Sequence, residues 1–169
     1  MKILLIGKTG QIGGELKNLM GDLGTLITLD RQQLDLCDTD LVEPVILRIQ
    51  PKIIINAAAY TEVDKSEEEH DLAMAVNGTG PRLLAKAAKK IGAGLIHYST
   101  DYVFDGRSDT PYKEEDIPNP LSIYGKSKLE GEKALARAGI PYLILRTSWV
   151  YSLRGKNFLL SIQKLAKEK

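Results

Sequence analysis

The sequence predicts an α/β fold: a doubly wound parallel sheet flanked by helices on both faces. Short apolar runs alternate along the 169 residues with segments whose apolar residues repeat at helical spacing. Three glycines at three-residue spacing follow the first apolar run. Strands that alternate with helices pair in parallel through right-handed crossovers, and this gives the doubly wound arrangement. We expect a single dinucleotide-binding domain over residues 1–169.

Five short apolar runs are the expected strands. They cover Lys2–Ile6, Thr25–Leu29, Ile53–Asn56, Gly94–Tyr98 and Tyr142–Arg146. Runs of this kind are typical of parallel strands that are buried on both faces. The third run is followed by three alanines, which are small enough to let a cofactor lie close to the backbone.

Helical spacing of apolar residues predicts the helices. They are expected over residues 15–20, within 40–50, over 82–90, over 121–137 and over 157–167. Pro44 is tolerable only in the first turn of its helix, because proline has no backbone N–H to donate. Ser66–Glu69 has the pattern of a capping box that opens a helix, and Pro81 is expected to break or kink that helix. A polar loop is expected over residues 105–119.

The glycines Gly7, Gly10 and Gly13 form the pattern G-x-x-G-x-x-G between the first expected strand and the first expected helix. Glycine permits a tight turn and a close approach to a pyrophosphate, whose charge the helix N-terminus stabilises. Asp30 ends the second strand, where an acid can hydrogen-bond the ribose hydroxyls of adenosine. We interpret the pattern as a variant of the Rossmann-like fingerprint. The weaker alternative is that the glycines only turn the chain and Asp30 only caps a loop.

The segment Tyr124-Gly-Lys-Ser-Lys128 places a phenol and an ammonium one helical turn apart. A free tyrosine has a pKa near ~10, and a nearby ammonium lowers it by favouring the phenolate. Tyr124 is therefore a candidate general acid or base. The glycine pattern near the start of the same chain supports this interpretation, because it predicts a dinucleotide cofactor for the reaction.

Composition argues against several other classes of protein. The chain has 23 Lys and Arg against 22 Asp and Glu, a net charge of +1 that gives no electrostatic footprint for nucleic acid. No apolar run approaches the ~20 residues of a membrane span, and Met1 leads directly into the first expected strand, so we expect neither a membrane anchor nor a signal peptide. Cys37 is the only cysteine, which excludes an internal disulfide and favours a cytoplasmic location.

Five segments carry a resemblance to a known family. They are Gly7–Gly13 (GKTGQIG), Asn56–Thr61 (NAAAYT), His97–Phe104 (HYSTDYVF), Asn119–Lys128 (NPLSIYGKSK) and Leu145–Tyr151 (LRTSWVY). In this order they resemble the extended short-chain dehydrogenase/reductase superfamily and, within it, the dTDP-4-dehydrorhamnose reductase family. Related sugar-nucleotide dehydratases tend to carry Asp-Glu after the threonine of the third segment, whereas this chain carries Asp-Tyr. The missing glutamate removes the acid that a dehydration would need.

For the cofactor, the resemblance implies contacts along the glycine turn and the ends of the following strands. The implied cofactor-binding residues are Gly7, Gly10, Gln11, Ile12, Gly13, Asp30, Arg31, Asp35, Leu36, Ala59, Tyr60, Thr61, Tyr124 and Lys128. Asp30 should repel the 2′-phosphate of NADP and favour NADH, whereas Arg31 could pair with that phosphate. The resemblance implies use of both NADPH and NADH, with NADPH slightly preferred.

For the chemistry, the resemblance implies Thr100, Tyr124 and Lys128 as the catalytic residues. Tyr124 would be the general acid, Lys128 would hold the nicotinamide ribose and lower the tyrosine's pKa, and Thr100 would hydrogen-bond the substrate's carbonyl. Thr100, Asp101 and Trp149 would bind the substrate. The alternatives left open are a helix-surface role for Tyr124, a strand-capping role for Thr100 and Asp101, and a core position for Trp149.

The implied reaction is the reduction of dTDP-4-dehydro-6-deoxy-L-mannose, a dTDP-linked deoxyhexulose, to dTDP-L-rhamnose. The resemblance also implies a homodimer, and magnesium at Glu15, although one solvent-facing carboxylate does not define a metal site. Members of the family are longer, so we expect this chain to lack their C-terminal substrate lobe. Two other functions stay open: another sugar-nucleotide reductase or epimerase, and a non-catalytic NADP-binding regulatory module.

Overall fold

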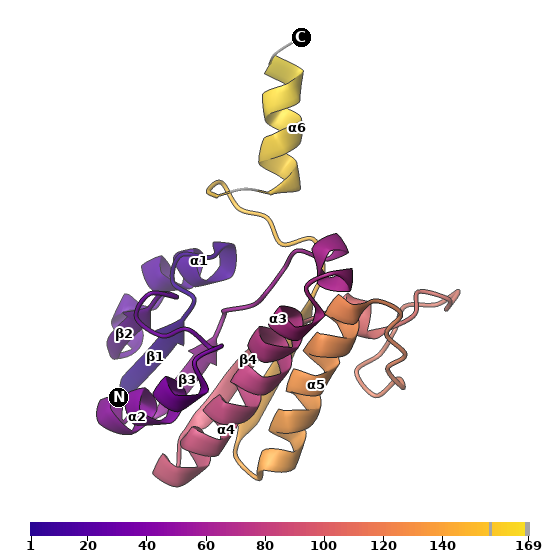
Figure 1. Ribbon diagram of the computed structural model, residues 1–169. Helices are drawn as coiled ribbons and strands as arrows, with labels where there is room; N and C mark the ends of the chain where they lie inside the picture. Colours follow the sequence, from indigo (N-terminus) through magenta and orange to yellow (C-terminus); the bar gives the residue numbers. More distant parts are fainter. Residues whose placement is uncertain (156, 168–169) are drawn as a thin grey trace.

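The computed structural model describes residues 1–155 and 157–167. Five parallel strands form one sheet in the order β2-β1-β3-β4-β5 (Figure 1). The strands are β1 (Lys2–Ile6), β2 (Thr25–Leu29), β3 (Ile53–Asn56), β4 (Gly94–Thr100) and β5 (Tyr142–Thr147). All five predicted strands are confirmed, and the last two extend slightly beyond their predicted ends.

The helices follow the strands in the predicted alternation. They are α1 (Gln11–Leu19), α2 (Thr39–Ile49), α3 (His70–Met74), α4 (Gly80–Ile91), α5 (Ile123–Ala138) and α6 (Phe158–Lys167). Short 3₁₀ turns lie at Gly21–Leu23 (η1), Asp64–Glu67 (η2) and Asp101–Val103 (η4), and a π-helical turn (η3, Ala75–Thr79) joins α3 to α4. Pro81 thus follows an irregular turn, as predicted, and α4 starts one residue before it.

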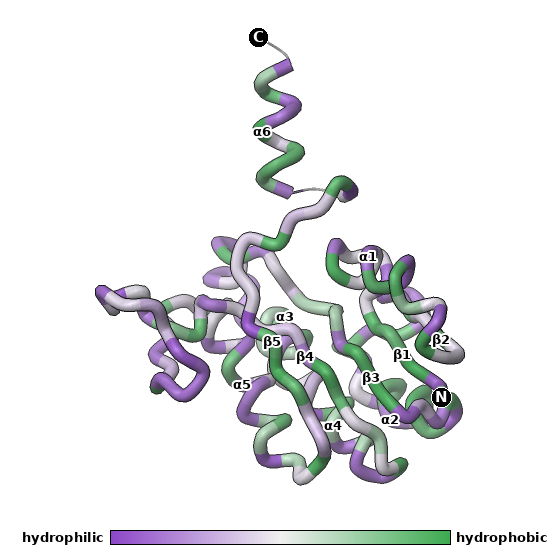
Figure 2. Tube along the Cα trace, turned by 180° about the vertical axis from the view of Figure 1, so that it is seen from behind, coloured by the Kyte–Doolittle hydropathy of each residue, from purple (hydrophilic) through white to green (hydrophobic). Residues whose placement is uncertain are grey.

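The main core lies between the sheet and the helices α2, α4 and α5 (Figure 1). Fully buried side chains such as Leu4, Ile54, Leu84 and Leu95 fill it. Each such side chain contributes about 1.5–3 kcal/mol of transfer free energy. On the opposite face, Leu16 of α1 packs against a smaller cluster on β1 and β3, while β4 and β5 lie uncovered in the view from behind (Figure 2). Helices therefore lie on both faces, but one face is covered only in part.

Two local predictions were wrong because tertiary contacts use the residues differently. Ser66 donates its hydroxyl to the carbonyl of Val63 within a 3₁₀ turn, so it does not cap α3. Two of the following acids bond elsewhere: Glu67 accepts the backbone N–H of Ile123 at 2.8 Å, and Glu69 accepts the hydroxyl of Tyr60.

Pro44 lies in the second turn of α2, not in the first. The helix begins at Thr39 because the Asp38 carboxylate accepts the N–H of Asp40 and caps it. The helix continues through the proline because Val42 and Ile46 are fully buried against the sheet.

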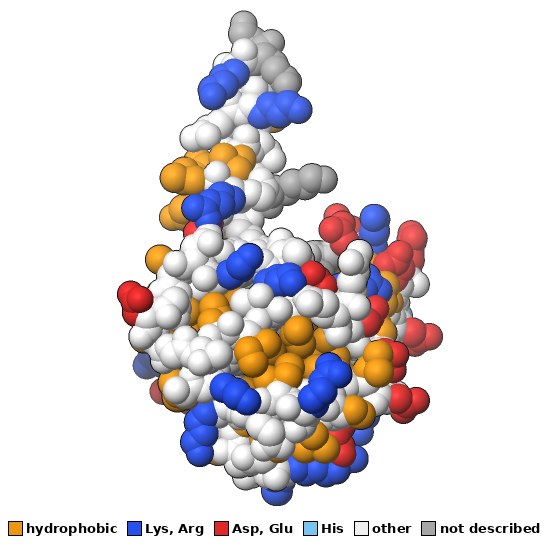
Figure 3. Space-filling view, turned by 90° about the vertical axis from the view of Figure 1, so that its left-hand side faces the viewer, with side chains coloured by type: hydrophobic (Ala, Val, Ile, Leu, Met, Phe, Trp, Pro, Cys, Tyr) orange, Lys and Arg blue, Asp and Glu red, His pale blue; other side chains and the backbone are white. Residues whose placement is uncertain are grey.

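Helix α6 stands off from the rest of the molecule (Figures 1 and 3). Its apolar residues are largely exposed, as in Phe158 and Leu165. Figure 3 also shows hydrophobic side chains gathered on the side of the molecule toward β2, with Lys and Arg around them. Within the part of the chain that the structure describes, no helix has the length and apolar character needed to cross a membrane.

A cofactor-type cleft that leads to the tyrosine–lysine pair

The glycine turn after β1 is packed so closely that side chains would not fit. A Cβ atom on Gly7, whose φ is +89°, would lie 2.7 Å from the backbone nitrogen of Ala58. A Cβ atom on Gly13 would lie 2.1 Å from the carbonyl oxygen of Gly7. The turn therefore holds β1, α1 and the loop after β3 together at backbone distance. It presents the first N–H groups of α1, which have no partners within the helix.

We expect Gly13→Ala to lower the free energy of unfolding by about 1–3 kcal/mol, because the new methyl group forces α1 away from the turn. Gly14→Ala is a matched control on the same helix. Its Cβ would have an ordinary contact of 3.8 Å, and alanine favours helix over glycine by about 0.5–1 kcal/mol. Urea unfolding of both variants measures the difference. Equal effects at the two positions would show that close packing at Gly13 is unimportant.

A cleft of about 560 Å³ opens at the carboxyl ends of the strands. Ile6 at the end of β1 pairs with Asn56 at the end of β3, and the strand order reverses between these two strands. Ligands of open α/β sheets bind at such a reversal. The lining includes the following residues predicted for the cofactor: Gly7, Gly10, Gln11, Ile12, Asp30, Arg31, Asp35, Leu36, Ala59, Tyr60, Thr61, Tyr124 and Lys128. Gly13 lies beneath the turn and does not line the cleft.

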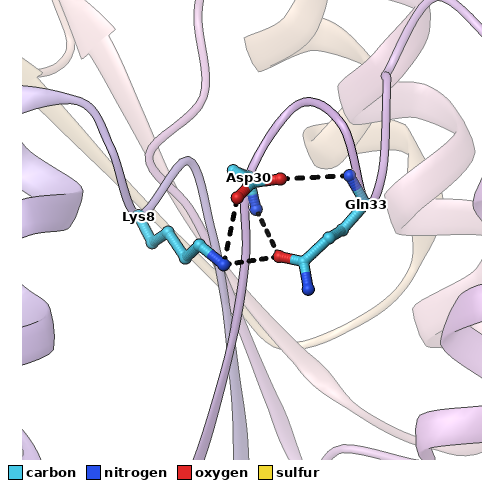
Figure 4. A network of polar contacts seen from close by, with 3 residues as sticks. All are labelled: Lys8, Asp30 and Gln33. Atoms are coloured by element: carbon cyan, nitrogen blue, oxygen red, sulfur yellow. Dashed lines mark hydrogen bonds and ion pairs between the residues drawn. The ribbon is translucent and has the colours of Figure 1, made fainter.

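One end of the cleft carries a polar network at the tip of β2. Lys8 Nζ lies 3.1 Å from an Asp30 carboxylate oxygen and donates to Gln33 Oε1 (Figure 4). The hydrogen bond from Lys8 holds the pKa of Asp30 below its ordinary value. Arg31 donates to Asp35 at 2.9 Å, so both predicted charges at this end are already paired within the chain.

The other end of the cleft carries Tyr124 and Lys128, on the first turns of α5. Ser122 caps this helix by accepting the N–H of Gly125 at 3.1 Å. A Cβ on Gly125 would lie 2.2 Å from the carbonyl of Tyr102, so glycine lets the helix start directly against the segment after β4. Lys128 is 2% exposed and donates to the carbonyl of Tyr98 at 2.6 Å. The predicted pair therefore lies beside the end of β4.

The expectation that Lys128 lowers the pKa of Tyr124 is wrong for this arrangement. The pKa of Tyr124 is raised, first by burial and further by the charge of Asp101, while the hydrogen bond with Thr100 acts in the opposite direction. Burial also lowers the pKa of Lys128 to about 8. Loss of solvation is thus the largest cause of both shifts.

We expect the Lys128 ammonium to titrate near pH 8, well below an ordinary lysine. Between this pH and about 10.4, the ordinary lysine pKa, the unfolded chain binds more protons than the folded chain. The lysine's contribution to the free energy of unfolding therefore rises with pH across this window, by a total on the order of 3 kcal/mol. NMR of the Lys128 side-chain carbon measures the pKa, and urea unfolding of wild type against Lys128→Met isolates the contribution. Titration near pH 10.4 would contradict the expectation.

Thr100 and Asp101 lie beside Tyr124 at the end of β4 but do not line the cleft. The Thr100 hydroxyl donates to Asp101 Oδ1 at 3.1 Å and accepts the N–H of Tyr102. The structure therefore brings Thr100 together with Tyr124, as predicted, while the substrate role of Asp101 stays a prediction.

Trp149 is not brought to the cleft. Its indole is 73% exposed and packs edge-on against Phe158, with ring centroids 5.2 Å apart. The alternative that Trp149 belongs to the core is therefore wrong, and its predicted contact with substrate has no support from its neighbours. Glu15 lies 4.0 Å from Arg154, and residues 1–155 and 157–167 contain no group of three or more His, Cys, Asp or Glu side chains suited to a metal ion.

Sequence reasoning missed Asn77, which joins two walls of the cleft. It is 1% exposed in the π-helical turn between α3 and α4. Its carboxamide accepts the N–H of Tyr60 and donates to the carbonyl of Tyr60, both at 3.0 Å. It also donates to Ser127 Oγ, which donates to the carbonyl of Tyr124. A π-helical turn is often found at a functional site, but no sequence pattern marked this one.

Comparison with known proteins places the chain in a family. A sequence model described as the RmlD substrate binding domain matches residues 1–169. The chain belongs to this family. It is 49% identical over its whole length to the dTDP-4-dehydrorhamnose reductase of Shigella flexneri, of which the match covers 58%. It therefore spans little more than half the length of such curated relatives.

Solved structures of the same kind match the fold closely. A dTDP-4-dehydrorhamnose reductase from Clostridium acetobutylicum superposes with a TM-score of 0.96 at 43% identity, over 99% of this chain and 60% of that one. The enzyme from Bacillus anthracis, solved in complex with NADP, gives a TM-score of 0.95 at 38% identity, with the same coverage of both chains. The predicted Rossmann-like fold and the predicted family are both confirmed.

Proposed function

We propose that this chain is the cofactor-binding part of a reductase that converts dTDP-4-dehydro-6-deoxy-L-mannose into dTDP-L-rhamnose for polysaccharide synthesis. The observation that carries the proposal is one continuous cleft, which runs from the glycine turn and Asp30 to Tyr124 and Lys128. A dinucleotide site that ends at a half-buried tyrosine and a buried lysine is suited to hydride transfer coupled to proton transfer. The curated relatives named dTDP-4-dehydrorhamnose reductase support this substrate class.

The residues of the cleft fit a nicotinamide dinucleotide. A Cβ atom on Gly7 would collide with the backbone of Ala58, and one on Gly13 with the carbonyl of Gly7. Glycine at these positions lets the turn pack closely and brings the N-terminus of α1 to the cleft, where its N–H groups can bind a pyrophosphate. Gln11 and Ile12 line this part of the cleft, and the 59–61 segment leads toward Tyr124. When bound, NADPH or NADH supplies the hydride. The NADP complex of the Bacillus anthracis relative supports this choice of cofactor.

The chain's own residues would supply a proton and hold the reacting groups in place. The raised pKa of Tyr124 keeps its phenol protonated at neutral pH, which is the form needed to protonate the oxygen of a reduced carbonyl. Lys128, whose pKa is about 8, stays mostly charged there and stabilises the phenolate that remains. Thr100 would orient the same carbonyl oxygen through its hydroxyl.

Several finer properties belong to this proposal as well. Asp101 and Trp149 would contact the sugar nucleotide, and the segment by which the relatives exceed this chain would supply the rest of the substrate site. We also propose a cytoplasmic homodimer. A magnesium site would need ligands beyond Glu15, because Arg154 is the charged group nearest to that carboxylate among the ion pairs of the described residues.

The test is NADPH consumption with dTDP-4-dehydro-6-deoxy-L-mannose, together with direct binding of NADP⁺. Two proteins are compared: this chain, and this chain joined to the C-terminal segment of the Shigella flexneri relative. We expect both to bind NADP⁺ and the joined protein to consume NADPH. Binding without consumption by either protein would favour a regulatory module, and consumption only with another keto sugar would identify a different reductase.

A further inference from the structure

Lys8 is held beside Asp30 by the fold of the glycine turn. The backbone N–H groups of Gly7 and Lys8 both donate to the carbonyl of Leu29, the last residue of β2, at 2.9 and 3.2 Å. This pairing brings the second residue of the turn next to the first residue after β2. The Lys8 side chain then lies across the tip of β2, only 23% exposed, against Asp30 and Gln33 (Figure 4).

We infer that Lys8, and not Arg31, is the residue that admits a 2′-phosphate at this end of the cleft, so that the chain can bind NADP as well as NAD. The inference rests on the proposed function, because it assigns a phosphate subsite within the same cofactor cleft. Neither the glycine pattern nor the acid at Asp30 predicts it. From sequence alone, Asp30 favours NADH and only Arg31 offers a counter-charge.

The donors of Lys8 leave room for a phosphate. A lysine ammonium has three N–H donors and no acceptor. One is directed to Asp30 Oδ2 at 3.1 Å and one to Gln33 Oε1 at 2.5 Å, which leaves a third for a ligand. Because Lys8 neutralises Asp30, a phosphate near this carboxylate meets an ion pair instead of an isolated negative charge.

Arg31 lines the cleft, whereas Lys8 reaches it only beside Asp30, but the charge of Arg31 is less suited to the same task. Its guanidinium donates to Asp35 through Nε at 2.9 Å, and its side chain is 72% exposed. A charge that exposed is screened by water and salt, and its attraction for a ligand is correspondingly weak. Lys8 is buried to a larger extent and is fixed by two partners.

Gln33 and Asp30 hold the subsite in place and explain tolerance of both cofactors. The Gln33 N–H donates to Asp30 Oδ1, and the Asp30 N–H donates to Gln33 Oε1, at 3.1 and 3.2 Å. The carboxylate can therefore still accept a ribose hydroxyl of NAD, while Lys8 serves the phosphate of NADP. One site thus serves two ligands that differ only in the 2′-phosphate.

Isothermal titration of residues 1–169 tests the inference with NADP⁺ and NAD⁺, and with 2′,5′-ADP and 5′-ADP as smaller probes of the same difference. The variants are Lys8→Met, the charge-preserving Lys8→Arg, and Arg31→Met as a matched loss of charge. We expect Lys8→Met to weaken the binding of NADP⁺ and of 2′,5′-ADP by a factor on the order of 10- to 100-fold. The affinities for NAD⁺ and 5′-ADP should change by less than about threefold, and Lys8→Arg should retain most of the NADP⁺ affinity.

Each other outcome has a distinct meaning. If Arg31→Met gave the phosphate-specific loss and Lys8→Met did not, the assignment to Lys8 would be overturned. If Lys8→Met weakened the binding of all four ligands equally, Lys8 would only shape the turn, and the inference would also fail. If wild type bound neither cofactor nor probe, the cofactor cleft itself would be refuted and this subsite with it. Thermal melting of each variant confirms that a loss of binding does not reflect unfolding.

Discussion

Replacement of Tyr124 by phenylalanine will reduce the rate of NADPH-dependent sugar reduction by a factor on the order of 10²–10⁴, the usual contribution of a positioned acid. The substitution removes one oxygen atom from a side chain whose pKa is raised by burial and whose hydroxyl bonds to Thr100. The aromatic ring stays in place against Tyr102, at a centroid distance of 5.7 Å. The loss should therefore be in the chemical step and not in the fold.

The measurement is single-turnover NADPH oxidation by this chain joined to the C-terminal segment of the Shigella flexneri relative. Tyr142→Phe is the matched control, because it makes the same chemical change at an exposed residue at the start of β5, whereas the cleft lies at the carboxyl ends of the strands. NADP⁺ affinity should change by less than about threefold in both variants, since Tyr124→Phe keeps the ring that lines the cleft and removes only the hydroxyl. If Tyr124→Phe turned over like the control, the assignment of Tyr124 as the acid would be wrong.

The parts of the fold that could be predicted are those that local sequence determines. Each strand is a short apolar run, and the first is followed at once by the glycines that its turn requires, so strand positions and the cofactor end of the cleft follow from neighbours in sequence. Tyr124 and Lys128 were predictable for the same reason, because their spacing alone places them on one helical face. The environment of this pair was not predictable. Its burial depends on β4, which lies far away in the chain, and burial set the direction of both pKa shifts.

The residues that sequence reasoning missed or misread are those whose partners are distant. Lys8 reaches Asp30 and Gln33 only because the turn after β1 is hydrogen-bonded to the end of β2. Ser66–Glu69 has a capping pattern, but Glu67 is used to cap α5 instead, because the fold brings the start of α5 to it. A local pattern predicts what a side chain can bond, whereas packing decides which partner it obtains.

Asn77 gives the second large effect that we expect. Asn77→Ala should lower the free energy of unfolding by about 3–5 kcal/mol, because it leaves the N–H and the carbonyl of Tyr60 without their partner, at a cost of about 1–3 kcal/mol for each group. It also removes the bond to Ser127, whose hydroxyl keeps its bond to the carbonyl of Tyr124. All three bonds are 3.0 Å long, and both Asn77 and Ser127 are buried. Ser127→Ala is the comparison variant, since it removes the bond from Asn77 and the bond to the carbonyl of Tyr124 but keeps the two bonds between Asn77 and Tyr60.

The structural effect of Asn77 should extend to the cleft, because Tyr60 lines it and Tyr124 is bonded to the same network. We expect the Tyr60 amide to exchange with solvent faster in Asn77→Ala than in Ser127→Ala, and NADP⁺ binding to weaken in the same order. Urea unfolding, hydrogen exchange and NADP⁺ titration measure the three effects on one set of variants. Asn77→Asp keeps the acceptor for the Tyr60 N–H and loses the donors, so it separates the two bonds to Tyr60. If Asn77→Ala unfolded like wild type with unchanged exchange at Tyr60, this network would not hold the 59–61 segment against the helix of the proton donor.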